Sequence, residues 1–336
     1  MSHPILQKVQ TFLEQAGHRS VKVSDDLIEE FGEVCKSAIR KQFTEERGGK
    51  FRLRMSNIGK PLCQLQMEKT GAPAETPDYS FKMKVLFGDL IEASAMLILK
   101  ASGVDVQSEQ KAVTHSGEIQ GTYDVEIDNK IWDIKSASPF AFDKKFAQGF
   151  NTVVEDDAFG YASQGFMYAD SENKDFGGWI VINKSTGEWC ITETPLNIDE
   201  HKEKYVALAK NNIDSIKKNK KFKRCFTDIE ETFRKAKTGN RVLGLTCSYC
   251  AFKKACWGDE IQHLPQQQSK AIKYTQNTFF ISKDRKTWSD KYGYHFKDYK
   301  RFNADFKRWI KIFKADAKLR QESDAEIMSE FLSDSS

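Results

Sequence analysis

Apolar residues recur at helical spacing over much of the chain. Near the start, Ile5, Val9 and Leu13 fall on one face of a helix, and the pattern resumes from Leu27 to Phe43. A Gly-Gly pair at 48–49 ends this region. On this basis the sequence predicts helices in residues 1–50, with further helices at 80–102, 158–168 and 198–219.

Period-two alternation predicts two β-hairpins between these helices. The first pairs residues 121–127 with 130–136. The second pairs 179–182 with 188–194, and the polar segment 183–187 forms its turn. Helices and hairpins therefore alternate, which indicates an α/β (α+β) fold with a small central sheet flanked by helices.

Composition supports a folded chain. The 336 residues are 39% hydrophobic and 12% aromatic, which suffices for one large core or two modest ones. The best apolar run, Ala93–Leu99, is far shorter than the roughly 20 residues of a membrane span, and no signal segment is visible. We therefore expect a cytoplasmic protein without a membrane partner. In that compartment its seven cysteines are expected to be metal ligands or free thiols and not to form disulfides.

Charge is distributed unevenly near the C-terminus. Residues 270–320 carry fifteen Lys or Arg against five Asp or Glu, interleaved with aromatic residues. Such a segment suits contact with phosphates and stacking on bases, although its aromatic side chains could equally form the core of a small helical subdomain. A helix with one apolar stripe is predicted from Phe302 to Phe313, and residues 321–336 form an acidic tail.

The first hairpin carries a group of charged residues with a specific register. If Asp128 and Asn129 form a two-residue turn, Asp124 lies directly opposite Asp133. Two carboxylates at that distance repel each other unless a divalent cation such as Mg²⁺ or Mn²⁺ lies between them. Alternation puts Lys135 on the same face, where it could orient or deprotonate a water. The alternative is a solvent-exposed hairpin with ordinary surface charges.

Two helices add polar side chains to the candidate site. Glu92 shares a face of the 80–102 helix with apolar residues. A carboxylate buried there would need an ion-pair partner or a metal ion, and the alternative is that Glu92 lies at the edge of the helix and reaches solvent. Gln164 and Tyr168 lie four residues apart in the 158–168 helix and share a face. Their side chains could bind a phosphate or Lys135. Alternatively, Tyr168 is a core residue and Gln164 lies at the rim of the core.

Three cysteines form a compact motif after the predicted core. Cys247, Cys250 and Cys256 have the spacing C-x2-C-x5-C, and Cys63 is a fourth cysteine far upstream. Thiols at this spacing favour a metal or iron–sulfur site, with Zn²⁺ as the competing occupant, over buried structural thiols. The spacing of Cys225 suggests no such role.

Together these motifs resemble the RecB-like branch of the PD-(D/E)XK nucleases. They look most like its iron–sulfur exonucleases, which include CRISPR-associated adaptation nucleases and many phage recombination or replication nucleases. The match covers about residues 55–260 and preserves the order of the family's motifs. One departure is Ile91, because many relatives have histidine at or next to the position of Glu92. The matching residues are Glu92 on a helix, Asp124 in a G-x-x-D strand, Asp133 and Lys135 in a D-x-K strand, Gln164 and Tyr168 in a Q-x3-Y helix, and Cys63, Cys247, Cys250 and Cys256 as cluster ligands.

The resemblance implies a restriction-endonuclease-like core and a metal-dependent DNA exonuclease. Glu92, Asp124 and Asp133, with the Ile134 carbonyl, would hold Mg²⁺ or Mn²⁺, and the four cysteines a structural [4Fe–4S] cluster. It further implies that the substrate is linear DNA, single- or double-stranded. The implied partners are an annealing protein, a helicase or further copies of the chain, and the implied location is the host cytoplasm if a phage encodes the protein. The alternatives are an endonuclease or structure-specific nuclease, or a non-catalytic DNA-binding protein stabilised by zinc. The predicted organisation is a helical region at 1–54, a nuclease core at 55–262, a basic aromatic subdomain at 263–320 and an acidic tail at 321–336.

Overall fold

The computed structural model divides the chain into two compact units. Unit 1 contains residues 1–71 and 76–222, and unit 2 contains residues 72–75 and 223–336. In the part of the chain that the structure describes, no helix is long and apolar enough to cross a membrane. The described residues are 3–44, 51–155, 157–196, 198–233, 236–258 and three short strands between 279 and 296.

Unit 1 is built around a five-stranded mixed sheet. The strands follow the chain order from β1 to β5, and neighbouring strands are antiparallel except for the parallel pair β3–β4. This confirms the mixed α/β core with a central sheet, whereas β1 is a strand that the sequence pattern did not reveal. The strands are β1 (Val106–His115), β2 (Ile119–Ile127), β3 (Lys130–Ala137), β4 (Asp175–Asn183) and β5 (Trp189–Glu193).

One face of the sheet packs against a group of helices from the second half of unit 1. Tyr123, Ile131 and Trp179 from the strands join Phe166 and Tyr205 from the helices in one buried cluster. Several of its aromatic rings meet edge to face, which adds to the free energy gained from burial. The elements on this face are α5 (Pro139–Lys144), the 3₁₀ helix η1 (Phe146–Gln148), α6 (Phe150–Glu155), α7 (Tyr161–Ser171) and α8 (Asp199–Lys217).

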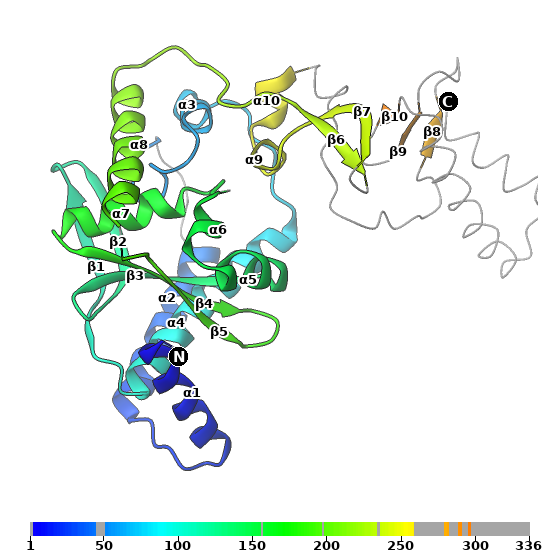
Figure 1. Ribbon diagram of the computed structural model, residues 1–336. Coiled ribbons are helices and arrows are strands. Elements are labelled where there is room, and N and C mark those ends of the chain that lie inside the picture. The colour runs from blue at the N-terminus through cyan, green and yellow to red at the C-terminus, as the bar shows by residue number, and fades with distance from the viewer. Residues whose placement is uncertain are drawn as a thin grey trace, which may run out of the picture. The chain divides into compact units, whose positions relative to one another are not determined.

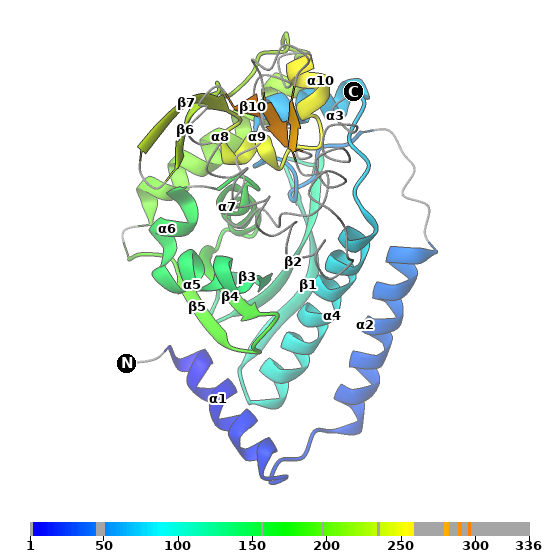
Figure 2. The ribbon, with the colours of Figure 1, turned by 90° about the vertical axis from the view of Figure 1, so that its right-hand side faces the viewer.

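The other face of the sheet is covered by α1 and α4, and α2 lies alongside α4 (Figures 1 and 2). Ile5 and Val9 of α1 and Leu99 of α4 are buried with Trp132 and Ile134 of β3. The helical N-terminal region is therefore part of the core of unit 1. These helices are α1 (Pro4–Gly17), α2 (Asp25–Phe43) and α4 (Tyr79–Ala101), and α3 (Leu62–Thr70) packs against α8.

The hairpin of β2 and β3 has the predicted turn. Asp128 and Asn129 have φ angles of 52° and 58°, the left-handed values that a two-residue type I′ turn requires. Ile127 pairs with Lys130, and Val125 pairs with Trp132. The predicted turn and the pair Ile127–Lys130 are therefore confirmed, and Asp124 and Asp133 are the next residues on the two strands after the last pair of the ladder.

Unit 2 contains the cysteine motif and two small sheets. Strands β6 (Ile229–Phe233) and β7 (Ala236–Val242) form an antiparallel pair that precedes α9 (Leu245–Ser248) and α10 (Lys253–Trp257). Three short strands, β8 (Phe279–Ile281), β9 (Trp288–Asp290) and β10 (His295–Phe296), form the second sheet. The rest of the predicted basic aromatic subdomain, with the 302–313 helix and the acidic tail, lies outside the described residues.

Candidate functional site

The two aspartates of the hairpin lie where β2 and β3 stop pairing. The ladder ends at the pair Val125–Trp132, one residue before Asp124 and Asp133. Beyond this point the Oδ2 of Asp124 accepts a hydrogen bond of 2.7 Å from the backbone N–H of Ile134. A side-chain carboxylate thus replaces a backbone partner, which fixes Asp124 against β3.

Asp133 and Lys135 form an ion pair on β3. The Lys135 Nζ lies 2.8 Å from Oδ1 and 2.7 Å from Oδ2 of Asp133, and the contact with Oδ1 is a hydrogen bond. Asp133 is buried, with 3% of its surface exposed, and its Oδ2 has no hydrogen-bond partner. Burial of a carboxylate is costly without compensation, and here the Lys135 ammonium supplies it by contacting both oxygens of Asp133.

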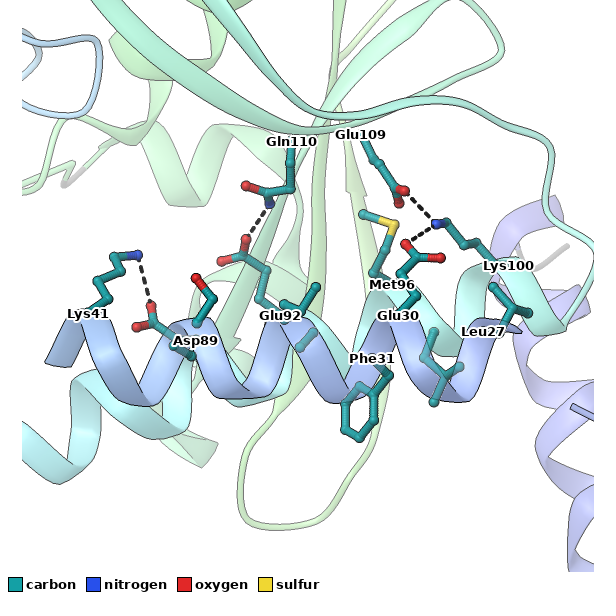
Figure 3. A pocket seen from close by; sticks show the side chains of 15 residues that line it. Leu27, Glu30, Phe31, Lys41, Asp89, Glu92, Met96, Lys100, Glu109 and Gln110 are labelled. Carbon is teal, nitrogen blue, oxygen red and sulfur yellow. Dashed lines mark hydrogen bonds and ion pairs between the residues drawn. The ribbon is translucent and has the colours of Figure 1, made fainter. Parts of the chain in front are cut away.

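Glu92 joins the aspartates from α4. That helix begins after Asp78, whose carboxylate accepts the N–H of Phe81 at 3.1 Å. The Oε1 of Glu92 accepts a hydrogen bond of 2.7 Å from Nε2 of Gln110 on β1 (Figure 3). Glu92 also lines a pocket of about 480 Å³ between α2, α4 and β1. It is therefore a half-buried carboxylate with a polar partner, as its place on an apolar helix face suggested.

The three carboxylates and the lysine interact electrostatically. Burial raises the pKa of Asp124 well above its usual value, and the negative charges of Asp133 and Glu92 raise it further. Burial also raises the pKa of Glu92, although its hydrogen bond with Gln110 counteracts this. Burial by itself lowers the pKa of Lys135, but Asp133 and Asp124 outweigh that effect and raise it above its ordinary value. Lys135 is therefore a protonated cation beside an excess of carboxylates.

This donor set fits a hard divalent cation in its chemistry. Three carboxylates against one ammonium leave an excess of negative charge, and oxygen atoms are the ligands that Mg²⁺ and Mn²⁺ prefer. Among the described residues, however, no three His, Cys, Asp or Glu side chains are already placed as a set of metal ligands. Lys135, the Ile134 N–H and Gln110 engage oxygens of the three carboxylates. Binding a cation would thus require local rearrangement of these contacts.

Helix α7 places two tyrosines near the cluster. It begins at Tyr161 because Asp157 accepts the N–H groups of Tyr161 and Ala162, both at 2.9 Å. The Lys135 Nζ lies 5.0 Å from the centre of the Tyr161 ring, a cation–π contact that the motif analysis did not assign. Tyr161 was noticeable in the sequence only as the residue one turn before Gln164.

Tyr168 is a core residue that also adjoins the site. It is 3% exposed, and its ring packs so closely on β2 that a Cβ on Gly121 would lie 2.7 Å from its Cε1. Burial raises its pKa to about 12, a side-chain hydrogen bond with Gln164 opposes this, and Asp133 and Asp124 raise it. The core interpretation of Tyr168 is therefore correct, and the Gln164–Tyr168 pair still lies within electrostatic range of the carboxylates.

The cysteine motif folds into a short loop of unit 2. The N–H of Cys250 donates to the carbonyl of Cys247 at 3.1 Å, and Cys247 and Cys256 pack against Leu243 and Trp257. Arg224 donates from Nε and Nη2 to the carbonyl of Cys256 at 3.1 and 2.9 Å, and its guanidinium lies 4.3 Å from the centre of the Trp257 ring. Arginine thus fixes the segment before β6 against the loop.

Cys225 follows Arg224 in the chain and is a further candidate metal ligand, which its spacing in the sequence did not indicate. Burial raises the pKa of the Cys247 thiol, and Cys250, Cys256 and Cys225 raise it further, so these three cysteines lie within electrostatic range of Cys247. Among the described residues, the cysteines are not already placed as a set of metal ligands. Cys63 lies at the start of α3 in unit 1, and its role as a fourth ligand stays a prediction. None of the seven cysteines, all within the described residues, forms a disulfide. Thiolates suit Zn²⁺ or an iron–sulfur cluster equally.

Comparisons with known proteins add little to this picture. No protein-family model and no curated protein sequence matches the chain. Among solved structures, the crystal structure of SSO0001 resembles it with a TM-score of 0.35 and 14% identity, over 68% of this chain and 96% of that chain. A TM-score of this size supports neither a shared fold nor a shared function.

Proposed function

We propose that the chain is a metal-dependent nuclease, an exonuclease that hydrolyses phosphodiester bonds in linear DNA. The observation that carries the proposal is that Asp124 and Asp133 directly follow the last pair of the β2–β3 ladder, where Asp124 accepts the Ile134 N–H and Lys135 pairs with Asp133. Glu92 adds a third acidic side chain to the group around the Lys135 ammonium. The choice of an exonuclease follows the resemblance of the motifs to those of the iron–sulfur exonucleases.

The carboxylates are the proposed metal ligands. Asp124, Asp133 and Glu92, with the carbonyl of Ile134, would hold Mg²⁺ or Mn²⁺ once Lys135 and Gln110 release the oxygens that they now engage. A bound divalent cation would polarise a phosphoryl oxygen and lower the pKa of a nearby water. The buried Oδ2 of Asp133 lies in the ion pair with Lys135 but accepts no hydrogen bond, so a cation that displaces the lysine would take this oxygen.

Lys135 acts as a positively charged group and not as a base. In the metal-free chain its ammonium is paired with Asp133, and Asp133 and Asp124 raise its pKa, so of the two roles that the sequence left open we assign it the orientation of water. The ammonium would also offset the negative charge that develops on the phosphate in the transition state. The Tyr161 ring limits where the ammonium can lie, and Gln164 with Tyr168 supports the same side of the site.

The first experiment is a cleavage assay on end-labelled linear and on closed circular DNA, each single- and double-stranded, with Mg²⁺ or Mn²⁺. We expect degradation of linear DNA and its loss in Asp133→Asn, which keeps the shape of the side chain and removes its charge. The matched control is Asp175→Asn, an exposed aspartate at the start of the neighbouring strand β4, which should cleave like the parent chain.

Three outcomes would contradict the proposal. Cleavage that survives Asp133→Asn would show that the site is assigned wrongly. Cutting of closed circles would favour the endonuclease alternative. Binding of DNA without cleavage, with either ion, would favour the non-catalytic alternative.

A further inference from the structure

Gln110 has an unusual conformation in the middle of β1. It lies between the pairs Glu109–Val125 and Lys111–Tyr123, and the same register puts it opposite Asp124. Its φ angle is 44°, in the left-handed region that residues other than glycine, asparagine and aspartate rarely adopt. A strained residue within a strand persists when the surrounding structure holds it there, and such residues cluster at functional sites.

The distortion changes where the side chain points. Neighbouring side chains of a regular strand point to opposite faces, yet both Glu109 and Gln110 line the pocket beside α4 (Figure 3). There Glu109 forms an ion pair with Lys100, while Nε2 of Gln110 donates to Oε1 of Glu92 at 2.7 Å. The left-handed turn of the backbone thus brings the amide onto a carboxylate of the candidate site.

The contact joins the two parts of the site that come from different elements. Asp124 is fixed against β3 by the Ile134 N–H, and Asp133 is fixed by Lys135. Glu92 comes from α4, and the amide of Gln110 ties it to the strand that lies next to Asp124. A hydrogen bond of this kind to a ligand carboxylate orients it and supports its affinity for metal.

We propose that Gln110 is a positioning residue, whose strained conformation holds the Glu92 carboxylate at the edge of the Asp124–Asp133 pair for a divalent cation. This inference rests on the proposed function, because it concerns the same carboxylates. Gln110 acts through Glu92 and takes no part in the chemistry itself. The strain is retained because relaxing it would move the amide away from α4.

Two substitutions in the full-length chain separate the amide from the strain. Gln110→Met keeps the length of the side chain and removes the donor, and Gln110→Gly removes both the donor and the strain. We expect Mn²⁺ dissociation constants, measured by titration calorimetry, to rise roughly tenfold to a hundredfold in both variants. The melting temperature of the metal-free Gly variant should equal or exceed that of the parent, which a purely structural role for Gln110 would not allow.

Controls distinguish the inference from the proposed function. Gln120→Met, at an exposed position on β2, should leave Mn²⁺ binding unchanged. If the parent chain and Asp133→Asn bind Mn²⁺ equally, the proposed function fails and the inference fails with it. If Asp133→Asn loses Mn²⁺ while either Gln110 variant binds it like the parent, the inference alone is overturned.

Discussion

The carboxylate cluster of unit 1 and the cysteine loop of unit 2 are both candidate metal sites, but they differ in what holds them before any ion arrives. In unit 1, pairing with β4 fixes Asp133, the Ile134 N–H fixes Asp124, and Lys135 neutralises part of their charge. In unit 2, burial and the neighbouring cysteines raise the pKa of the Cys247 thiol, which favours its uncharged form, and Arg224 is engaged by the carbonyl of Cys256 and by Trp257.

This difference indicates how metal binding would affect the stability of each site. The aspartates are kept together by the sheet in spite of their burial and mutual repulsion, so a cation relieves an electrostatic cost that already exists. The cysteine loop consists of two short helices and turns around a small apolar group, so metal binding would itself supply much of its stability. Substitutions should therefore affect the two sites in opposite ways.

The largest effect is expected in the cysteine loop. Cys247→Ser should reduce the metal content of the anaerobically purified chain from stoichiometric to trace levels, because Cys250, Cys256 and Cys225 all lie within electrostatic range of Cys247. Elemental analysis for iron and zinc, with a visible spectrum, measures the loss and identifies the occupant, since an iron–sulfur protein is brown and a zinc protein is colourless. Retention of full metal content by Cys247→Ser would remove this loop as a metal site.

The same measurement identifies the fourth ligand. We expect Cys63→Ser to lose metal like Cys247→Ser, as the family resemblance implies, and Cys190→Ser, a thiol of strand β5, to keep it. Loss of metal from Cys225→Ser with retention by Cys63→Ser would instead place all the ligands within unit 2.

The next effect concerns the cation of the carboxylate cluster. Lys135→Met should reduce cleavage roughly 10²- to 10³-fold, because a charge that stabilises the transition state is lost. The affinity for Mn²⁺ should not fall, since the lysine competes with metal for Asp133 and is not a ligand. Lys130→Met is the control, because this lysine of the same strand forms an exposed ion pair with Glu193, which contributes little. A parallel loss of Mn²⁺ affinity and cleavage in Lys135→Met would contradict the assigned role.

The sequence predicted the hairpin site well because its geometry is local. A two-residue turn at Asp128 and Asn129 determines which residues face each other, so Asp124, Asp133 and Lys135 could be grouped without knowledge of the rest of the fold. Helix α4 was equally clear, since its apolar positions recur over many turns.

The features that the sequence did not reveal depend on contacts between distant segments. Strand β1 has few buried residues and therefore little alternation, so neither the strand nor Gln110 was apparent. Tyr161 meets Lys135 only because α7 packs against β3. Cys225 lies more than twenty residues before the cysteine motif, and Arg224 brings it close through contacts that no spacing rule describes.

The smallest effect is a dependence of stability on pH that the aspartate pair should impose on the metal-free protein. Because the pKa of Asp124 is raised in the folded chain, folding favours its protonated form. The stability that this group contributes is complete below its unfolded pKa of about 3.9 and is lost as pH rises through the higher folded value. Asp124→Asn cannot ionise, so its melting temperature in the presence of a chelator should exceed that of the parent increasingly as pH rises from mild acid to neutrality.

Metal should reverse this advantage at neutral pH, because the ionised parent carboxylate can bind Mn²⁺ and the amide binds it weakly. Melting curves of both chains at a series of pH values, with chelator and with Mn²⁺, test both halves of the argument, and Asp175→Asn again serves as the exposed control. A constant difference in melting temperature across the pH series would show that Asp124 is not held under repulsion. The carboxylate cluster and the cysteine loop would then no longer differ in the way argued above, since neither would be strained before metal binds.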